Sequence, residues 1–183
     1  MKHITPYNNE WPVRFSLVAK FLREHLPDTC FIHHIGSTSI PGMPSKDIID
    51  LDIECPNGSM SSIIDSLDRA GYDHEGDKGI ATREAFQPKV GSLAFNLPPH
   101  HLYACETQSP ELFKHLAFRE YLVSHPDRAK WLAREKIEKD QSAKSRSEYI
   151  INKSIIYEII TEESLAWANK ALQWTPINGT AEF

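Results

Sequence analysis

Acidic and aliphatic residues alternate along residues 47–54, and a strand accommodates this alternation in only one way. Because side chains in a strand have a period of two, the aliphatic residues face one side and the acids face the other. The aliphatic residues are Ile49, Leu51 and Ile53, and the acids are Asp50, Asp52 and Glu54. Carboxylates in a row repel one another and are most easily tolerated in water or against cations. The segment therefore predicts a strand with a core face and an acidic face that is either solvated or in contact with cations.

A turn-rich loop precedes this strand and follows a short apolar strand expected at 31–35. Residues 36–46 hold two glycines, two prolines and four Ser or Thr residues. A phosphate can approach the backbone at Gly36, which lacks a Cβ, and the Ser37 hydroxyl and nearby N–H groups can donate to it. Mg²⁺ is commonly held by one or two carboxylates together with substrate phosphates. The pattern predicts phosphate at the loop and a divalent cation at Asp50 and Asp52.

Two strings in this region resemble known proteins. Ile35-Gly36-Ser37 followed by Ile49-Asp50-Leu51-Asp52-Ile53 resembles the signature of the polymerase-β-like nucleotidyltransferase superfamily. The longer string GSTSIPGMPSKDIIDLDI resembles the GrpB family, a group of small bacterial proteins that also occurs fused to some dephospho-CoA kinases. Further family-like pieces lie at 83–86, 116–126 and 149–153, so the likeness runs from about residue 6 to residue 160.

The resemblance implies an α+β, nucleotidyltransferase-like fold with a small mixed sheet flanked by helices and a helical C-terminal section. It also implies catalytic roles for Asp50 and Asp52, which would hold Mg²⁺ (or Mn²⁺), while Ser37 holds a phosphate. The implied reaction transfers a nucleotidyl group from a nucleoside triphosphate to an unknown acceptor. The alternative is a non-catalytic module that binds a nucleotide or a coenzyme-A precursor. A third, weaker hypothesis is a phosphohydrolase that uses His34 or His101.

The position of a third carboxylate separates these alternatives. Catalytic members of the resembled superfamily usually add an acid from a later strand, but residues 100–103 here contain none. The nearest substitutes in the sequence are Glu54, Glu84 and Glu106. A third carboxylate close to the two aspartates favours catalysis, whereas a histidine or an apolar residue in its place favours binding alone.

Four cations in the family-like pieces are candidates for phosphate binding: Lys46, Arg83, Arg119 and Lys153. Arg83 is preferred because its strand is expected beside the acidic one and its guanidinium can bind phosphate through two nitrogens. For each cation, a surface charge or a structural ion pair is the competing interpretation. His101 is a further candidate for phosphate binding or acid–base chemistry, because imidazole titrates near neutral pH.

Length and composition limit the remaining possibilities. The 183 residues, 40% of them hydrophobic, predict one domain over 1–183, with a helical section at about 109–173 and a loose tail at 174–183. The net charge of −5 argues against a large nucleic-acid footprint and leaves a nucleotide or phosphorylated small molecule as the expected partner. Three isolated cysteines and the lack of a long apolar segment predict a cytoplasmic protein without a membrane span. The sequence does not predict the oligomeric state.

Periodicity and turn signals place the remaining elements. Helices are expected at 8–26, 59–70, 109–124, 126–144, 148–160 and 161–173, with Thr161 capping the last. Further strands are expected at 81–87, 93–97 and 101–105. Residues 72–80 are expected to form a loop or an irregular hairpin.

Overall fold

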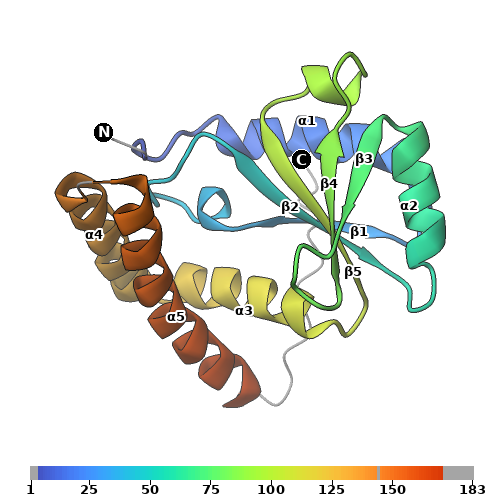
Figure 1. Cartoon of the computed structure of the whole chain (residues 1–183). Coiled ribbons are helices and arrows are strands. Elements are labelled where there is room, and N and C mark those ends of the chain that lie inside the picture. Colours follow the sequence, from blue (N-terminus) through green and yellow to red (C-terminus); the bar gives the residue numbers. More distant parts are fainter. Residues whose placement is uncertain (1–3, 144, 171–183) are drawn as a thin grey trace.

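A five-stranded sheet with helices on both faces forms the centre of the molecule (Figure 1). The computed structural model describes residues 4–143 and 145–170. The strands are β1 (Phe31–Ile35), β2 (Ile49–Cys55), β3 (Tyr72–Gly76), β4 (Arg83–Pro88) and β5 (His100–Glu106). The helices are α1 (Trp11–Arg23), α2 (Met60–Arg69), α3 (Pro110–Ser124), α4 (Pro126–Ser142) and α5 (Arg146–Lys170).

The sheet is mixed, and its strand order is β1-β2-β5-β4-β3. β2 runs parallel to β5, whereas every other neighbouring pair is antiparallel. The register places His101 of β5 beside Asp50 and Tyr103 beside Asp52. On the other side of β2, Ile35 at the end of β1 lies beside Asp50. Both aspartates therefore lie in an inner strand, with a neighbour on each side.

The aliphatic face of β2 is buried under α1 and α2, as the alternation predicted. Leu51 and Ile53 are fully buried in one apolar cluster, together with Leu22 of α1 and Leu67 of α2. Burying a side chain of this size stabilises the fold by about 1.5–3 kcal/mol. This cluster fixes the register of β2, because a shift by one residue would turn the acids into the core.

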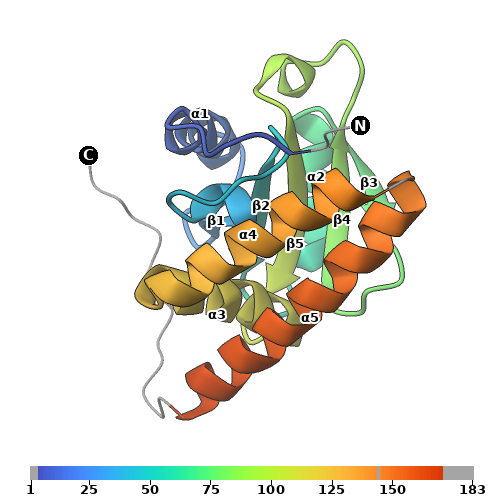
Figure 2. The ribbon, with the colours of Figure 1, turned by 90° about the vertical axis from the view of Figure 1, so that its left-hand side faces the viewer.

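The acidic face of the sheet is covered by α3, and α4 and α5 pack beyond it (Figure 2). Ile35 and Cys105 from the sheet pack with Leu112 and Leu116 of α3. The acids of β2 therefore lie beneath a helix and not on an open surface.

The α+β class, the small mixed sheet and the helical C-terminal section are confirmed. Three local expectations differ from the structure. The strand predicted at 93–97 is wrong: only a short 3₁₀ turn forms at Ala94–Asn96, and Leu93 and Phe95, which would share one face of a strand, are both exposed to solvent. Residues 72–76 form β3, because fully buried Tyr72 anchors them at the edge of the sheet.

The third difference concerns the C-terminal helices. The break predicted at Thr161 is wrong, because α5 continues through it as one helix of 25 residues. Ile156 and Ile160 of α5 are buried in one cluster with residues of α3 and α4, and this packing holds the helix straight past the threonine. Residues 171–173 of the predicted last helix, and the predicted tail at 174–183, lie outside the described residues. Among the described residues, no helix has the length and apolar character that crossing a membrane requires.

Candidate functional site

The turn after β1 brings the chain into contact with the first aspartate. Gly36 adopts φ 68° and ψ −166°, a conformation that side chains disfavour. A Cβ at this position would lie 2.6 Å from Asp50 Oδ2, which is far inside normal contact distance. Only a glycine therefore lets the backbone of the turn lie against the Asp50 carboxylate.

A cavity of about 260 Å³ opens beside this contact, between the sheet, α3 and α5. It is lined by Ile35, Gly36, Asp50, Arg83, Tyr103, Glu111, Lys114, His115, Phe118, Tyr157 and Thr161. Three predicted site residues, Gly36, Asp50 and Arg83, are therefore brought together, although they come from three separate parts of the chain. Asp52 is not among the lining residues, because it is completely buried.

A capped helix brings a second set of polar side chains to the cavity. The Ser109 hydroxyl accepts hydrogen bonds from the backbone N–H groups of Glu111 and Leu112, so α3 begins at a fixed residue. Residues three and four apart share one face of a helix. Glu111, Lys114 and His115 therefore all point toward the sheet, and each lines the cavity.

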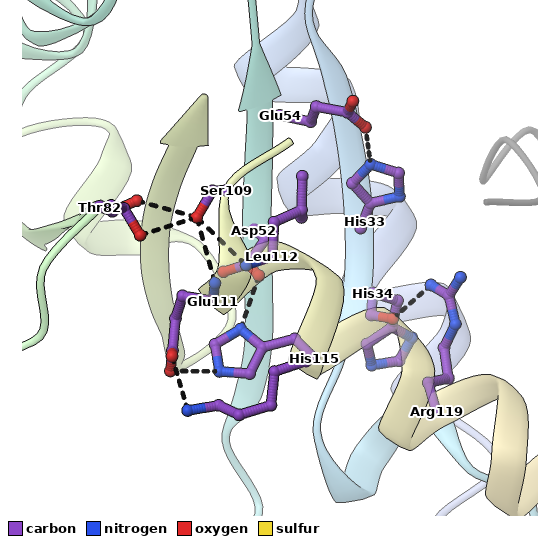
Figure 3. Close-up of polar contacts among 11 residues, drawn as sticks. His33, His34, Asp52, Glu54, Thr82, Ser109, Glu111, Leu112, His115 and Arg119 are labelled. Carbon is purple, nitrogen blue, oxygen red and sulfur yellow. Dashed lines mark hydrogen bonds and ion pairs between the residues drawn. The ribbon is translucent and has the colours of Figure 1, made fainter. Parts of the chain in front are cut away.

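His115 joins the second aspartate of β2 to a carboxylate of α3 (Figure 3). Its Nδ1 donates to Asp52 Oδ2 over 2.7 Å, and its Nε2 lies 3.3 Å from Glu111 Oε1. Burial alone lowers the pKa of His115, but the hydrogen bonds and charges of the two carboxylates outweigh it and raise that pKa to about 9. The ring is therefore an imidazolium at neutral pH, in which both nitrogens carry a proton.

The carboxylate of Glu111 is correspondingly stabilised as an anion. The hydrogen bond from His115 is the largest cause, burial opposes it, and Lys114 adds to it, so that the pKa of Glu111 falls to about 2. Lys114 Nζ lies 2.6 Å from Glu111 Oε2. Charges thus alternate from the cavity inward through Lys114, Glu111, His115 and Asp52.

Arg83 is a buried cation without a carboxylate partner in the described part of the chain. Its side chain is only 9% exposed and stacks on Tyr103, with the guanidinium carbon 4.3 Å from the ring centroid. Its Nε is buried and has no hydrogen-bond partner. One expectation about it is wrong: β4 does not lie beside β2, because the parallel strand β5 lies between them.

Ser37 lies directly after the glycine, but its hydroxyl is already engaged. Its Oγ is 2.6 Å from the Tyr157 hydroxyl, and Lys136 Nζ donates to it over 2.7 Å. Ser37 is 5% exposed and Lys136 is 2% exposed. A phosphate bound at this turn would therefore contact Ser37 as part of a buried cluster with Tyr157 and Lys136.

Of the other predicted cations and histidines, none whose side chain the structure describes lines the cavity. Lys46 is exposed on the loop before β2. Arg119 donates to the His34 carbonyl and to Glu120, so it ties α3 to β1. Lys153 belongs to α5, but its side chain lies outside the described residues. His101 Nδ1 lies 2.8 Å from Asp50 Oδ1 at the rim, and His34 stacks on Phe15 on the opposite face of the sheet.

The predicted substitutes for a third carboxylate do not reach the aspartates. Glu54 pairs with His33, and Glu84 pairs with His74 on the opposite face of the sheet. Glu106 accepts a hydrogen bond from the backbone of Gly58 at the far end of β5. Glu111 of α3 is the acid that approaches Asp52, and it does so through His115.

Sequence reasoning missed Glu111, Lys114, His115, Tyr157 and Thr161 as cavity residues. The available signal was the i, i+3, i+4 spacing of Glu111, Lys114 and His115 directly after a capping serine. That spacing places three polar groups on one helix face, but it does not reveal that this face packs on the acidic strand.

The arrangement of donors does not fit a Mg²⁺ ion shared by the two aspartates. Asp52 is fully buried, its Oδ2 is bonded to His115, and its Oδ1 has no hydrogen-bond partner. Asp50 Oδ1 is paired with His101. Within residues 4–143 and 145–170, no three His, Cys, Asp or Glu side chains stand close enough to hold a metal ion. As arranged, the pair offers a cation in the cavity one carboxylate, Asp50.

The fold and site define an α+β protein with a small mixed sheet and a Gly-Ser turn beside two aspartates of the next strand. Residues 2–163 match the family described as GrpB protein, and the chain belongs to that family. It resembles the crystal structure of the conserved protein GrpB from Enterococcus faecalis, with a TM-score of 0.75 and 27% identity over 90% of this chain and 98% of that one.

Curated relatives carry family names of the same kind. The UPF0157 protein YqkA of Bacillus subtilis is 41% identical over 68% of this chain, and the UPF0157 protein PA4798 of Pseudomonas aeruginosa is 28% identical over 73%. The matches span only 35% and 54% of those two proteins. A weaker likeness, with a TM-score of 0.48 at 9% identity, is to Cid1 in complex with its short product ApU, and it carries no argument about function.

Proposed function

We propose that this protein binds a nucleotide or another phosphorylated small molecule in the cavity between the sheet, α3 and α5. The observation that carries this proposal is Arg83, a guanidinium buried at the cavity without a carboxylate partner in the described part of the chain. An unpaired buried charge is costly, so a bound anion would remove a large penalty. Stacking on Tyr103 holds the guanidinium in place for such an anion.

The neighbouring groups favour phosphate as that anion. The guanidinium fork matches two phosphate oxygens, and Lys114 adds a second positive charge to the wall. The Gly36 backbone lines the same cavity, with the Asp50 carboxylate lying against it. The volume of about 260 Å³ lies slightly below the roughly 300–1,000 Å³ usual for ligand pockets, so it suits the phosphates and sugar better than a whole nucleotide. A coenzyme-A precursor offers the same phosphate chemistry.

Nucleotidyl transfer is the second candidate. It is favoured by the position of Asp50 and Asp52 on one face of β2 beside the Gly36–Ser37 turn. It requires Mg²⁺ or Mn²⁺, to which the pair offers only Asp50 while His115 holds Asp52. The neighbours of the two aspartates on β5 are His101 and Tyr103, not a carboxylate, so binding without transfer is the better supported function.

Calorimetric titration tests the binding proposal. The ligands are inorganic triphosphate, ATP, UTP and dephospho-coenzyme A, titrated into the wild type, Arg83→Met and Arg128→Met. Arg128 is a matched control, because its guanidinium also stacks on an aromatic ring, Trp131, but it is paired with Glu163 away from the cavity. Losing charge-assisted hydrogen bonds worth about 1.5–3 kcal/mol weakens binding about 10- to 100-fold in Arg83→Met.

The control is expected to bind like the wild type. Equal binding by wild type and Arg83→Met, or no binding of any ligand at millimolar concentration, would contradict the proposal. Release of pyrophosphate from a nucleoside triphosphate in Mg²⁺, lost in Asp50→Asn, would instead establish the second candidate.

A further inference from the structure

The imidazole ring of His115 is held between two carboxylates that come from different elements. Asp52 belongs to β2 and Glu111 to the first turn of α3, and the ring bonds one through each nitrogen, over 2.7 and 3.3 Å. Asp52 is completely buried, and the His115 side chain is 21% exposed. A cation that bridges an aspartate of this strand to a second carboxylate is therefore already present, and it is a side chain of the protein.

Among the described residues, His115 is the ion-pair partner of Asp52, and the same ring contacts Glu111. Without the imidazolium, Asp52 would be a fully buried carboxylate with no ion-pair partner in the described part of the chain. A buried unpaired carboxylate is strongly disfavoured, so the site needs a cation at this position.

We infer that His115 occupies the place between Asp52 and a second carboxylate that a divalent cation would otherwise take, so that the cavity accepts its phosphorylated ligand without a divalent metal. Positive charge for the ligand then comes from Arg83 and Lys114. The part of this inference that concerns the ligand rests on the proposed function. The part that concerns the metal does not, because it depends only on which group occupies the space between Asp52 and Glu111.

Replacing His115 by alanine tests the metal part directly. The variant leaves Asp52 and Glu111 facing a space from which the ring has been removed, beside Asp50. Carboxylate oxygens are the ligands that Mg²⁺ and Mn²⁺ prefer. Mn²⁺ binding at pH 7, followed by the electron paramagnetic resonance signal of the free ion, is expected to be at least tenfold tighter in His115→Ala than in the wild type.

Two further variants serve as controls. His74→Ala removes an imidazole that lies 2.7 Å from Glu84 on the opposite face of the sheet, and it is expected to bind Mn²⁺ like the wild type. His115→Gln keeps a hydrogen-bonding group of similar reach but carries no charge, and it serves if the alanine variant does not fold; it too is expected to bind Mn²⁺ more tightly. Wild-type protein that binds one Mn²⁺ tightly, with the binding lost in Asp52→Asn, would overturn the inference.

The ligand part is tested on the wild type alone. Inorganic triphosphate and ATP are titrated in EDTA and again in excess Mg²⁺, which forms complexes with both ligands; binding in EDTA is expected, with an affinity at least equal to that in Mg²⁺. Binding that appears only with Mg²⁺ refutes the metal-free site while leaving the binding function intact. If neither ligand binds in either condition, the proposed function and the ligand part both fail, and the Mn²⁺ comparison still decides the metal part.

Discussion

The two aspartates of β2 are expected to respond very differently to the same substitution. Asp52 is 0% exposed and pairs with a largely buried imidazolium, whereas Asp50 is 28% exposed and pairs with His101, which is 49% exposed. Asp52→Asn preserves the shape of the side chain but leaves the His115 charge without its main counter-ion. Breaking one partner of a buried pair costs about 3–5 kcal/mol, so about 3 kcal/mol is expected for this partly accessible pair.

Asp50→Asn is the matched control, because it makes the same chemical change two residues away on the same strand face. Its pair is exposed to solvent, and such pairs contribute below about 1 kcal/mol. Urea unfolding at pH 7, followed by circular dichroism and tryptophan fluorescence, measures both variants. A difference of at least about 2 kcal/mol between them is expected. If the two variants lose equal, small amounts of stability, Asp52 and His115 do not form the ion pair described above.

Three other predictions concern the turn, the second histidine of β1 and the unpaired arginine. Gly36→Ala is expected to lower the unfolding free energy by at least about 1 kcal/mol more than Gly42→Ala. Both glycines have positive φ, but only at residue 36 does the new Cβ meet the Asp50 carboxylate. Equal losses for the two variants in urea unfolding would contradict this contact. Burial lowers the pKa of His34 from 6.5 to about 4, so on lowering the pH the unfolded chain takes up this proton before the folded protein does. The contribution of neutral His34 to the unfolding free energy is therefore complete above pH 6.5 and is lost as the pH falls toward 4. About 2 kcal/mol of this is lost between pH 7 and 5, and a His34→Gln variant with an equally steep pH dependence would refute the assignment. Arg83→Met is expected to keep the wild-type unfolding free energy within about 1 kcal/mol, because losing the stacking interaction is offset by removing an unpaired buried charge; a loss above about 2 kcal/mol would indicate a structural role.

Local patterns in the sequence were sufficient for the strands that carry the motif. The alternation at 49–54 predicted which face of β2 is acidic, and the glycine of the preceding loop predicted the turn that touches Asp50. Both conclusions depend on residues within one short segment. The capping serine and the proline after it likewise placed the start of α3 correctly.

Contacts between distant segments were beyond the reach of those patterns. Asp52 and His115 are separated by 63 residues, and they meet only because α3 packs across the acidic face of the sheet. The sequence also could not reveal that β5 inserts between β2 and β4, because strand order depends on how whole elements pack. Arg83 lines the cavity, but the expectation that its strand lies beside β2 was wrong, and its contact with phosphate stays a prediction.

The contact between Gly36 and the Asp50 carboxylate limits which residues family members can have at these two positions. The space that a Cβ at residue 36 would need is already occupied by the Asp50 carboxylate. A family member that retains the aspartate has to retain the glycine as well, because a side chain at residue 36 would overlap the carboxylate. In an alignment of the GrpB family, glycine is therefore expected at this position in every sequence that has the aspartate.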